Sequence, residues 1–271
     1  MIFFKLLRVI LHLLLGLLVC ALMFPCSSRA GRERHVRRWS ARLLRLCGVR
    51  LEVRDSAGGA DTAPALVVAN HISWIDVFVI NAVAPCRFVA KSDIRDWPLI
   101  GWLCQRAGTV FIARGRQRDV RRIYHGLVED LRGGERIAFF PEGTTAGQGS
   151  LLPFHANLFE AALDIAPVQP YALRYLDDAG RPHPAADFIG DTTFAQSMLA
   201  ILKSGGMRAE LLRLPLLDTA GTDRRQLAQA ARGAIADALG IAVDAPAPPA
   251  GSEAPVSGAE AEVPLAASAG R

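Results

Sequence analysis

The stretch "VVANHISWIDVF", Val67 to Phe78, decides the fold class and raises the question of function. It begins with a short apolar run that is typical of a buried strand. The run ends at Ala69, Asn70 and His71 follow at once, and Asp76 comes five residues after the histidine. In α/β proteins, functional side chains gather where strands end and loops begin. The stretch therefore predicts a strand that presents a histidine and a carboxylate at its carboxyl end.

The remainder of the chain alternates short apolar runs with longer periodic segments. This alternation predicts an α/β domain with a largely parallel sheet flanked by helices. The predicted strands are residues 65–69, 87–90, 109–113, 136–140, 168–176 and 208–217. Apolar residues recur with a helical period between them, which predicts helices at 118–132, 157–165, 194–203 and 224–239. The 271 residues suffice for a sizeable buried core.

Residues 1–28 are predicted to form a membrane anchor helix. Residues 9–24 are apolar apart from His12, and as a helix they would be about 24 Å long, against a hydrocarbon core of about 30 Å. Residues 2–8 supply the missing length if Lys5 and Arg8 reach the interface. A spanning helix, a helix lying in one leaflet and a cleaved signal peptide all fit this pattern. We favour an uncleaved anchor, because an arginine-rich segment follows it directly.

Residues 29–50 are predicted to form a basic amphipathic helix. Residues 29–54 contain nine arginines and two glutamates, a local charge of +7, and such flanks stay on the cytoplasmic side of a membrane. One helical face carries Val36, Trp39, Leu43, Leu46 and Cys47, and the opposite face carries Arg34, Arg38, Arg42 and Arg45. We favour a helix lying on an anionic membrane over a surface helix packed on the core. The protein is then expected at the cytoplasmic face of a membrane, the inner membrane if it is bacterial.

Composition and motif spacing indicate which kinds of site and which reactions the sequence does not support. The five cysteines have neither CxxC nor zinc-ligand spacing, so we expect no disulfide and no metal site. Neither a G-x-x-x-x-G-K-[ST] nor a G-x-G-x-x-G motif stands at a strand end, which gives nucleotide hydrolysis and hydride transfer no support. Residues 244–271 are rich in Ala, Pro, Gly and Glu and predict a disordered tail. A catalytic domain is thus expected over residues 51–243.

His71 and Asp76 have the spacing of a catalytic base and the group that orients it. A turn can bring the carboxylate to the imidazole, where it would fix the tautomer while the other ring nitrogen takes a proton from a hydroxyl. A local capping pair would explain an isolated motif of this kind equally well. Two further predicted strands also end in polar residues, however: "GTVFIARG" ends with Arg114, and "IAFFPEGTTAGQG" presents Glu142, Gly143 and Thr144. A guanidinium, backbone amides and a hydroxyl together suit a phosphate.

These residues carry a resemblance to a known family. "NHISWID", "VFIAR", "FPEGTT" and "APVQP" stand in the order and rough spacing of four motif blocks, so residues 51–239 resemble the 1-acylglycerol-3-phosphate acyltransferase (lysophosphatidic acid acyltransferase) family of glycerolipid acyltransferases. The resemblance implies that His71 acts as general base on the free hydroxyl of a lysolipid and that Asp76 orients it. The hydroxyl would attack the thioester of acyl-CoA or acyl-carrier protein.

The resemblance also implies how the acceptor is held. Arg114, with Glu142, Gly143 and Thr144, would bind the acceptor head group, normally a phosphate in this family. Lys91 matches a basic position common in the family and would meet the head group or the CoA phosphates, or would simply be a solvated strand end. "TTAGQG" differs from the usual sequence after the third block, which leaves the acceptor contacts open.

The implied reaction gives phosphatidic acid in phospholipid biosynthesis. It requires no cofactor besides the acyl-CoA or acyl-carrier protein co-substrate. The expected partners are membrane lipids and a lysophospholipid acceptor, and no nucleic acid. Within the same reaction class, the acceptor could instead be a lyso-ornithine lipid or another lysolipid. A membrane lipid-binding protein, or a lipid hydrolase in which His71 activates water, represents a different class.

Overall fold

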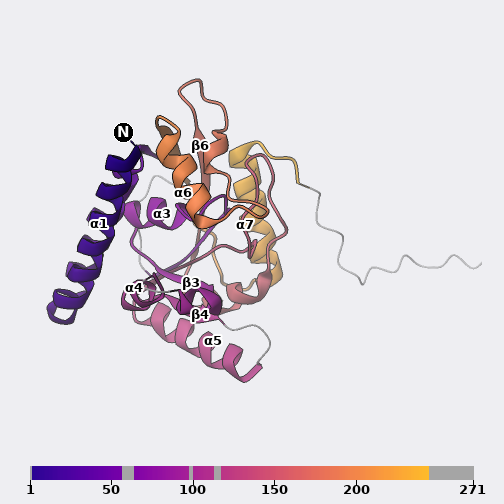
Figure 1. Ribbon diagram of the computed structural model, residues 1–271. Helices are drawn as coiled ribbons and strands as arrows, with labels where there is room; N and C mark the ends of the chain where they lie inside the picture. Colours follow the sequence, from indigo (N-terminus) through magenta and orange to yellow (C-terminus); the bar gives the residue numbers. More distant parts are fainter. Residues whose placement is uncertain (1, 57–63, 98–99, 113–116, 244–271) are drawn as a thin grey trace, which may run out of the picture.

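The computed structural model of the protein has a seven-stranded sheet at its centre (Figure 1). The structure describes residues 2–56, 64–97, 100–112 and 117–243. The strands are β1 Val49–Asp55, β2 Ala65–Ala69, β3 Arg87–Lys91, β4 Val110–Ile112, β5 Arg136–Phe139, β6 Val168–Leu176 and β7 Met207–Arg213. Their order is β1-β7-β6-β2-β5-β3-β4, and every neighbouring pair is parallel except β6 and β7. The predicted α/β fold with a largely parallel sheet is confirmed.

Helices cover both faces of this sheet. The α-helices are α1 Ile2–Leu22, α2 Arg29–Leu46, α3 Asp76–Val83, α4 Ile100–Arg106, α5 Gln117–Arg132, α6 Phe194–Lys203 and α7 Arg224–Leu239. The short 3-10 helices are η1 Phe24–Cys26, η2 Ser92–Asp96, η3 Ala156–Ala162 and η4 Pro184–Ala186. Helices α1, α2, α3 and α6 contribute to the core on one face, and α5, α7 and η3 contribute to the core on the other.

Strand β2 lies at the centre and is buried on both faces. Its side chains alternate, so that Val67 and Ala69 join the core beneath α2 and α3, whereas Leu66 and Val68 join the core beneath α5 and α7. All five of its residues are buried. A short, wholly apolar strand is typical of a parallel sheet covered on both sides, and its carboxyl end fixes the position of Asn70 and His71.

Most of these strands and helices were predicted from the sequence, but not all of them. The six predicted strands and the helices α5, α6 and α7 are present within a few residues of the predicted bounds, although residue 113 lies outside the described part of the chain. The predicted helix at 157–165 is the 3-10 helix η3. Strand β1 was not predicted, because it is an edge strand whose "VRLEVRD" sequence is largely exposed. Residue 50, the predicted end of the basic helix, lies inside β1.

The buried side of α2 corrects the expectation that this helix lays its apolar face on a membrane. Leu43, Leu44 and Cys47 are buried in the core, and Trp39 and Leu46 pack against it. Helix α2 therefore uses its apolar face to cover α3 and to receive α1, as a surface helix packed on the core does. Its arginine-rich face remains outward.

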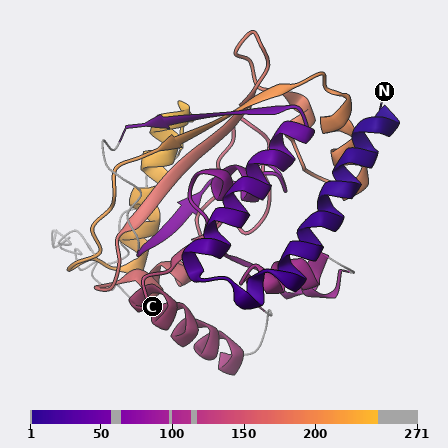
Figure 2. The ribbon, with the colours of Figure 1, turned by 90° about the vertical axis from the view of Figure 1, so that its left-hand side faces the viewer.

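Helix α1 packs along the domain with one face only. Figure 1 shows it on the outside of the molecule, and Figure 2 shows it beside α2 in front of the sheet. The buried face comprises Val9, His12, Gly16 and Cys20. The uncovered face exposes Phe3, Phe4, Leu7, Ile10, Leu11, Leu14, Leu15, Leu18 and Leu22. Among the described helices, α1 is the one with the length and apolar composition to cross a membrane.

Two reciprocal hydrogen bonds attach α1 to α2. The His12 Nε2 atom donates to the Trp39 carbonyl at 3.0 Å, and the Trp39 indole donates to the His12 carbonyl at 3.1 Å. The two rings stack with centroids 4.9 Å apart. Gly16 permits this approach, because a Cβ atom there would lie 2.5 Å from Trp39 Nε1. Lys5 adds a hydrogen bond to the Leu202 carbonyl at the end of α6.

The close approach at Gly16 predicts a specific cost of adding a methyl group. We expect Gly16→Ala to destabilise the protein by about 1–3 kcal/mol, the usual range for overpacking, because the indole must move. Gly233→Ala is the matched control, since nothing lies within 4 Å of that position in α7, and there alanine should stabilise by up to about 1 kcal/mol. Thermal unfolding in one detergent compares the variants. Equal midpoints would contradict the tight contact between α1 and α2.

Candidate active site

His71 and Asp76 meet at the carboxyl end of β2. The His71 Nδ1 atom lies 2.8 Å from Asp76 Oδ2. The Asp76 side chain is wholly buried, whereas 19% of the His71 side chain is exposed. Because a carboxylate accepts hydrogen bonds, Nδ1 carries the proton and Nε2 is the ring nitrogen left to receive another. The geometry thus brings together the two residues that the sequence predicted to be a base and its orienting group.

Four donors surround the Asp76 carboxylate. Besides His71, Oδ2 accepts the backbone amides of Ile72 at 2.8 Å and Ser73 at 2.9 Å, and Oδ1 accepts the Tyr175 hydroxyl at 2.6 Å. Asp76 is also the first residue of α3, where the helix dipole favours a negative charge. Burial and the adjacent carboxylate raise the pKa of Tyr175 well above its ordinary value, so its hydroxyl keeps the proton that it donates.

Glu142 is attached to the same turn but does not face outward. Its Oε1 accepts the His71 backbone amide at 2.7 Å, and its Oε2 accepts the Leu152 backbone amide at 2.9 Å. Burial raises the pKa of Glu142, and the two amide hydrogen bonds oppose that rise. With both oxygens occupied, Glu142 positions the His71 turn. The expected contact of Glu142 with an acceptor head group stays a prediction.

Gly143 and Thr144 form the turn that follows β5. Gly143 has a φ of 70°, which favours glycine, and a Cβ atom there would come within 3.3 Å of the His155 ring. Thr144 is exposed. The turn is fixed to His71 by Ala146, whose amide donates to the His71 carbonyl at 2.8 Å. The Thr144 hydroxyl is therefore available to a ligand beside the His71 turn.

Lys91 lies at the same edge of the sheet, and Arg114 lies outside the described residues. Lys91 is the exposed last residue of β3, which runs parallel to β5. The Phe140 ring, after the end of β5, stacks on the His71 ring with centroids 3.9 Å apart, and Phe88 of β3 stacks on Phe140. These rings close the side of the site toward β3. Strand β4 ends two residues before Arg114, whose role rests on the resemblance alone.

Tyr175 is a site residue that the sequence did not reveal. It lies on β6, 99 positions after Asp76, in none of the motif blocks. Its alternation with Tyr171 and Leu173 indicates one face of a strand but not which loop that face meets. Asn70 also acts across the sheet: its amide group donates to and accepts from the Leu173 backbone at 3.0 and 2.7 Å.

The contacts of His71 and Asp76 are typical of one class of enzyme. A buried carboxylate that orients a partly exposed histidine is the general-base part of a catalytic triad. It stands where parallel strands end, which is the usual position of a ligand site in this architecture. The arrangement suits an enzyme that removes the proton from a hydroxyl so that the oxygen can attack a substrate.

Comparisons with known proteins identify the family. Residues 50–174 match the family model described as Acyltransferase. The lyso-ornithine lipid O-acyltransferase of Pseudomonas aeruginosa is 41% identical over 209 residues, covering 77% of this chain and 79% of that protein. The chain therefore belongs to the acyltransferase family, and the resemblance seen in its sequence is confirmed.

Two further relatives match in different ways. The 1-acyl-sn-glycerol-3-phosphate acyltransferase of Neisseria gonorrhoeae is 47% identical over 117 residues, which cover 43% of this chain and 46% of that protein. The crystal structure of the 1-acyl-sn-glycerophosphate acyltransferase of Thermotoga maritima superposes with a TM-score of 0.59 at 19% identity, covering 87% of this chain and 96% of that one. The latter likeness shows a shared fold.

The two hydrogen bonds of Glu142 predict a kinetic signature. A carboxamide has one oxygen, so Glu142→Gln leaves either the His71 or the Leu152 amide without an acceptor, at a cost of about 1–3 kcal/mol. We expect kcat for acyl transfer to fall about tenfold, equivalent to about 1.4 kcal/mol, with little change in the acceptor KM. Glu160→Gln, at a half-exposed ion pair with Arg224, is the control and should change little. A raised acceptor KM at unchanged kcat would instead mean that Glu142 contacts the acceptor.

Proposed function

We propose that the protein transfers a fatty acyl chain to the free hydroxyl of a lyso-ornithine lipid. The observation that carries acyl transfer to a hydroxyl is the His71–Asp76 pair at the sheet edge. The acceptor is inferred from similarity: the relative that matches over 77% of the chain bears this activity in its name, whereas the Neisseria relative named for 1-acyl-sn-glycerol-3-phosphate matches over 43%. The longer match supports the alternative acceptor of the sequence analysis better than the phosphate acceptor favoured there.

The proposed reaction follows from the hydrogen bonds around His71. Its Nε2 atom takes the proton of the acceptor hydroxyl as the oxygen attacks the thioester carbonyl of acyl-CoA or acyl-carrier protein. Asp76 stabilises the imidazolium that forms. The carbon–sulfur bond then breaks, and the departing thiolate takes the proton back from Nε2. Proton removal by a positioned base is worth about 10²–10⁴-fold in rate.

The polar groups at the site accommodate an ornithine head group. Ornithine carries a carboxylate, and a guanidinium or an ammonium pairs with a carboxylate as it does with a phosphate. We therefore assign Lys91 and Arg114 to the acceptor's negative charge, and Thr144 with the Gly143 turn to its polar backbone. The presence of arginine at position 114 is thus compatible with either acceptor.

We further propose that α1 holds the enzyme at the cytoplasmic face of a membrane by lying in one leaflet. The helix exposes a row of large apolar side chains, while its opposite face is attached to α2 through His12 and Trp39. A helix that is half covered by its own domain cannot present apolar surface to lipid all round. This packing therefore favours the leaflet interpretation over a spanning helix.

Acyl transfer by the purified full-length chain tests the proposed function. Wild type and His71→Ala would be offered lyso-ornithine lipid and lysophosphatidic acid in parallel, with acyl-CoA and acyl-carrier protein as donors. We expect wild-type transfer to lyso-ornithine lipid and a loss of at least about 100-fold in His71→Ala, the scale of general-base catalysis. His125→Ala, an exposed histidine on α5, is the control and should keep full activity.

Each contrary outcome identifies another function. Transfer to lysophosphatidic acid alone would assign the protein to the phosphate acceptor. Fatty acid release without any acceptor would indicate a hydrolase. If wild type and His71→Ala behave alike, then His71 is not the base, and a lipid-binding role becomes the better explanation.

A further inference from the structure

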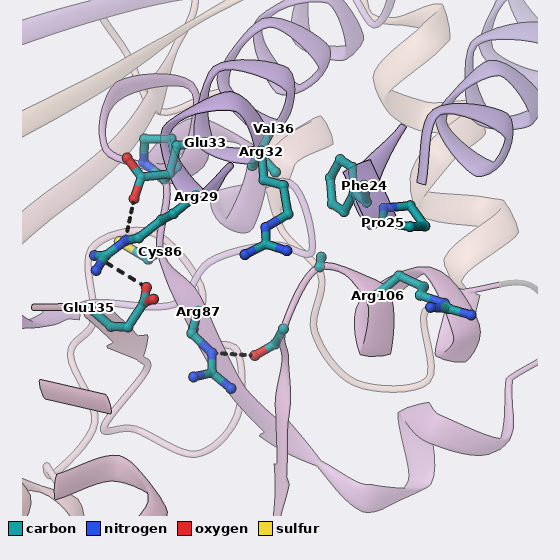
Figure 3. A pocket seen from close by; sticks show the side chains of 13 residues that line it. Phe24, Pro25, Arg29, Arg32, Glu33, Val36, Cys86, Arg87, Arg106 and Glu135 are labelled. Atoms are coloured by element: carbon teal, nitrogen blue, oxygen red, sulfur yellow. Dashed lines mark hydrogen bonds and ion pairs between the residues drawn. The ribbon is translucent and has the colours of Figure 1, made fainter. Parts of the chain in front are cut away.

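A second cavity lies at the opposite end of the sheet from His71. It has a volume of about 380 Å³ and is lined where β3 begins, at Arg87, and just before β5 begins, at Glu135. Because β2, β3 and β5 are parallel, these amino ends lie at the edge away from His71 and Glu142. The other walls come from the turn between α1 and α2, the first turns of α2 and the end of α4 (Figure 3).

Two of the four arginines that line this cavity are already neutralised. The guanidinium of Arg29 lies 3.0 Å from Glu33 and 3.3 Å from Glu135. The guanidinium of Arg87 pairs with Asp130, and its Nε donates to the Gly108 carbonyl at 3.1 Å. Figure 3 shows the contacts of Arg29 with Glu33 and Glu135 and the hydrogen bond of Arg87 to the Gly108 carbonyl. These ion pairs hold Arg29 and Arg87 in the cavity wall but leave little of their positive charge for a ligand.

Arg32 and Arg106 supply the remaining positive charge. Among the described residues, neither guanidinium lies in an ion pair with a carboxylate, and both side chains line the cavity (Figure 3). Arg106 is held over the Trp102 ring, with its guanidinium carbon 5.2 Å from the ring centroid. Guanidinium groups match phosphate oxygens well, so these two side chains offer charged donors to an anion in the cavity.

The apolar wall of the cavity continues onto the uncovered face of α1. Phe24, Pro25 and Val36 line it, and the residues just before Phe24 are exposed, 66% for Leu22 and 46% for Met23. A ligand with a phosphate and acyl chains would place the phosphate between the arginines and the chains along α1. We propose that this cavity binds the phosphate group of an anionic membrane phospholipid, at a site separate from the one that carries out acyl transfer.

Calorimetric titration of the full-length chain in an uncharged detergent tests this assignment. The probes are dioctanoyl phosphatidylglycerol, its phosphatidylcholine counterpart, coenzyme A and inorganic phosphate. We expect saturable binding of the anionic lipid and much weaker binding of the zwitterionic one. Arg32→Gln/Arg106→Gln should weaken binding of the anionic lipid by about tenfold or more, since two charge-assisted contacts are lost. Binding of coenzyme A should not change.

The control variant is Arg34→Gln/Arg38→Gln, which removes two exposed arginines of α2 that do not line the cavity. It should change the affinity for the anionic lipid by less than about twofold, because general surface attraction is weak and screened by salt. Unchanged thermal unfolding and retained acyl transfer in the Arg32/Arg106 variant would show that it is folded. Equal lipid binding by wild type and that variant overturns the proposal. So does an equal loss in both variants, or a loss confined to coenzyme A, which would assign the cavity to the soluble donor.

Discussion

The site depends on one buried carboxylate. Asp76 receives hydrogen bonds from the His71 ring, from two amides of its own turn and from the Tyr175 hydroxyl. Three of these donors come from the turn that follows β2 and the fourth from the end of β6, and Asp76 itself begins α3, so a single side chain fixes the relative positions of three elements. A buried acceptor that loses its partners costs about 1–3 kcal/mol. The fold that buries Asp76 therefore also fixes the orientation of the His71 ring.

The parallel sheet supplies the rest of the frame. Strands β2 and β5 end together, which allows Glu142 to receive the His71 amide and Phe140 to stack on the imidazole. The histidine is thus held at its backbone, its Nδ1 atom and one ring face, and Nε2 is left for chemistry. On the outer side, the contact between His12 and Trp39 attaches an apolar helix to the same domain. The sheet edge that carries His71 and the apolar face of α1 therefore belong to one packed domain.

The sequence predicted the contact between residues that are close in the chain and missed the contact between residues that are far apart in it. His71 and Asp76 are five residues apart, and a strand followed by a turn can join them in few ways. Tyr175 reaches Asp76 from another strand, and no spacing rule connects the two. The motif around Glu142 identified the residue but not its partners, because a carboxylate at a strand end serves a ligand or a backbone amide equally well. Helix α2 shows the same ambiguity: an apolar stripe fits a membrane or a protein core, and here it fits the core.

The protonation of the two ring nitrogens of His71 tests the central role of Asp76 most directly. Nitrogen-15 NMR of histidine-labelled protein resolves it, with His71→Gln to assign the signal among the six histidines. We predict that neutral His71 carries its proton on Nδ1 in the wild type, and that Asp76→Ala, which removes the acceptor of Nδ1, shifts the proton toward Nε2. A wild-type His71 protonated at Nε2, or a tautomer unchanged in Asp76→Ala, would contradict the conclusion that Asp76 orients the His71 ring.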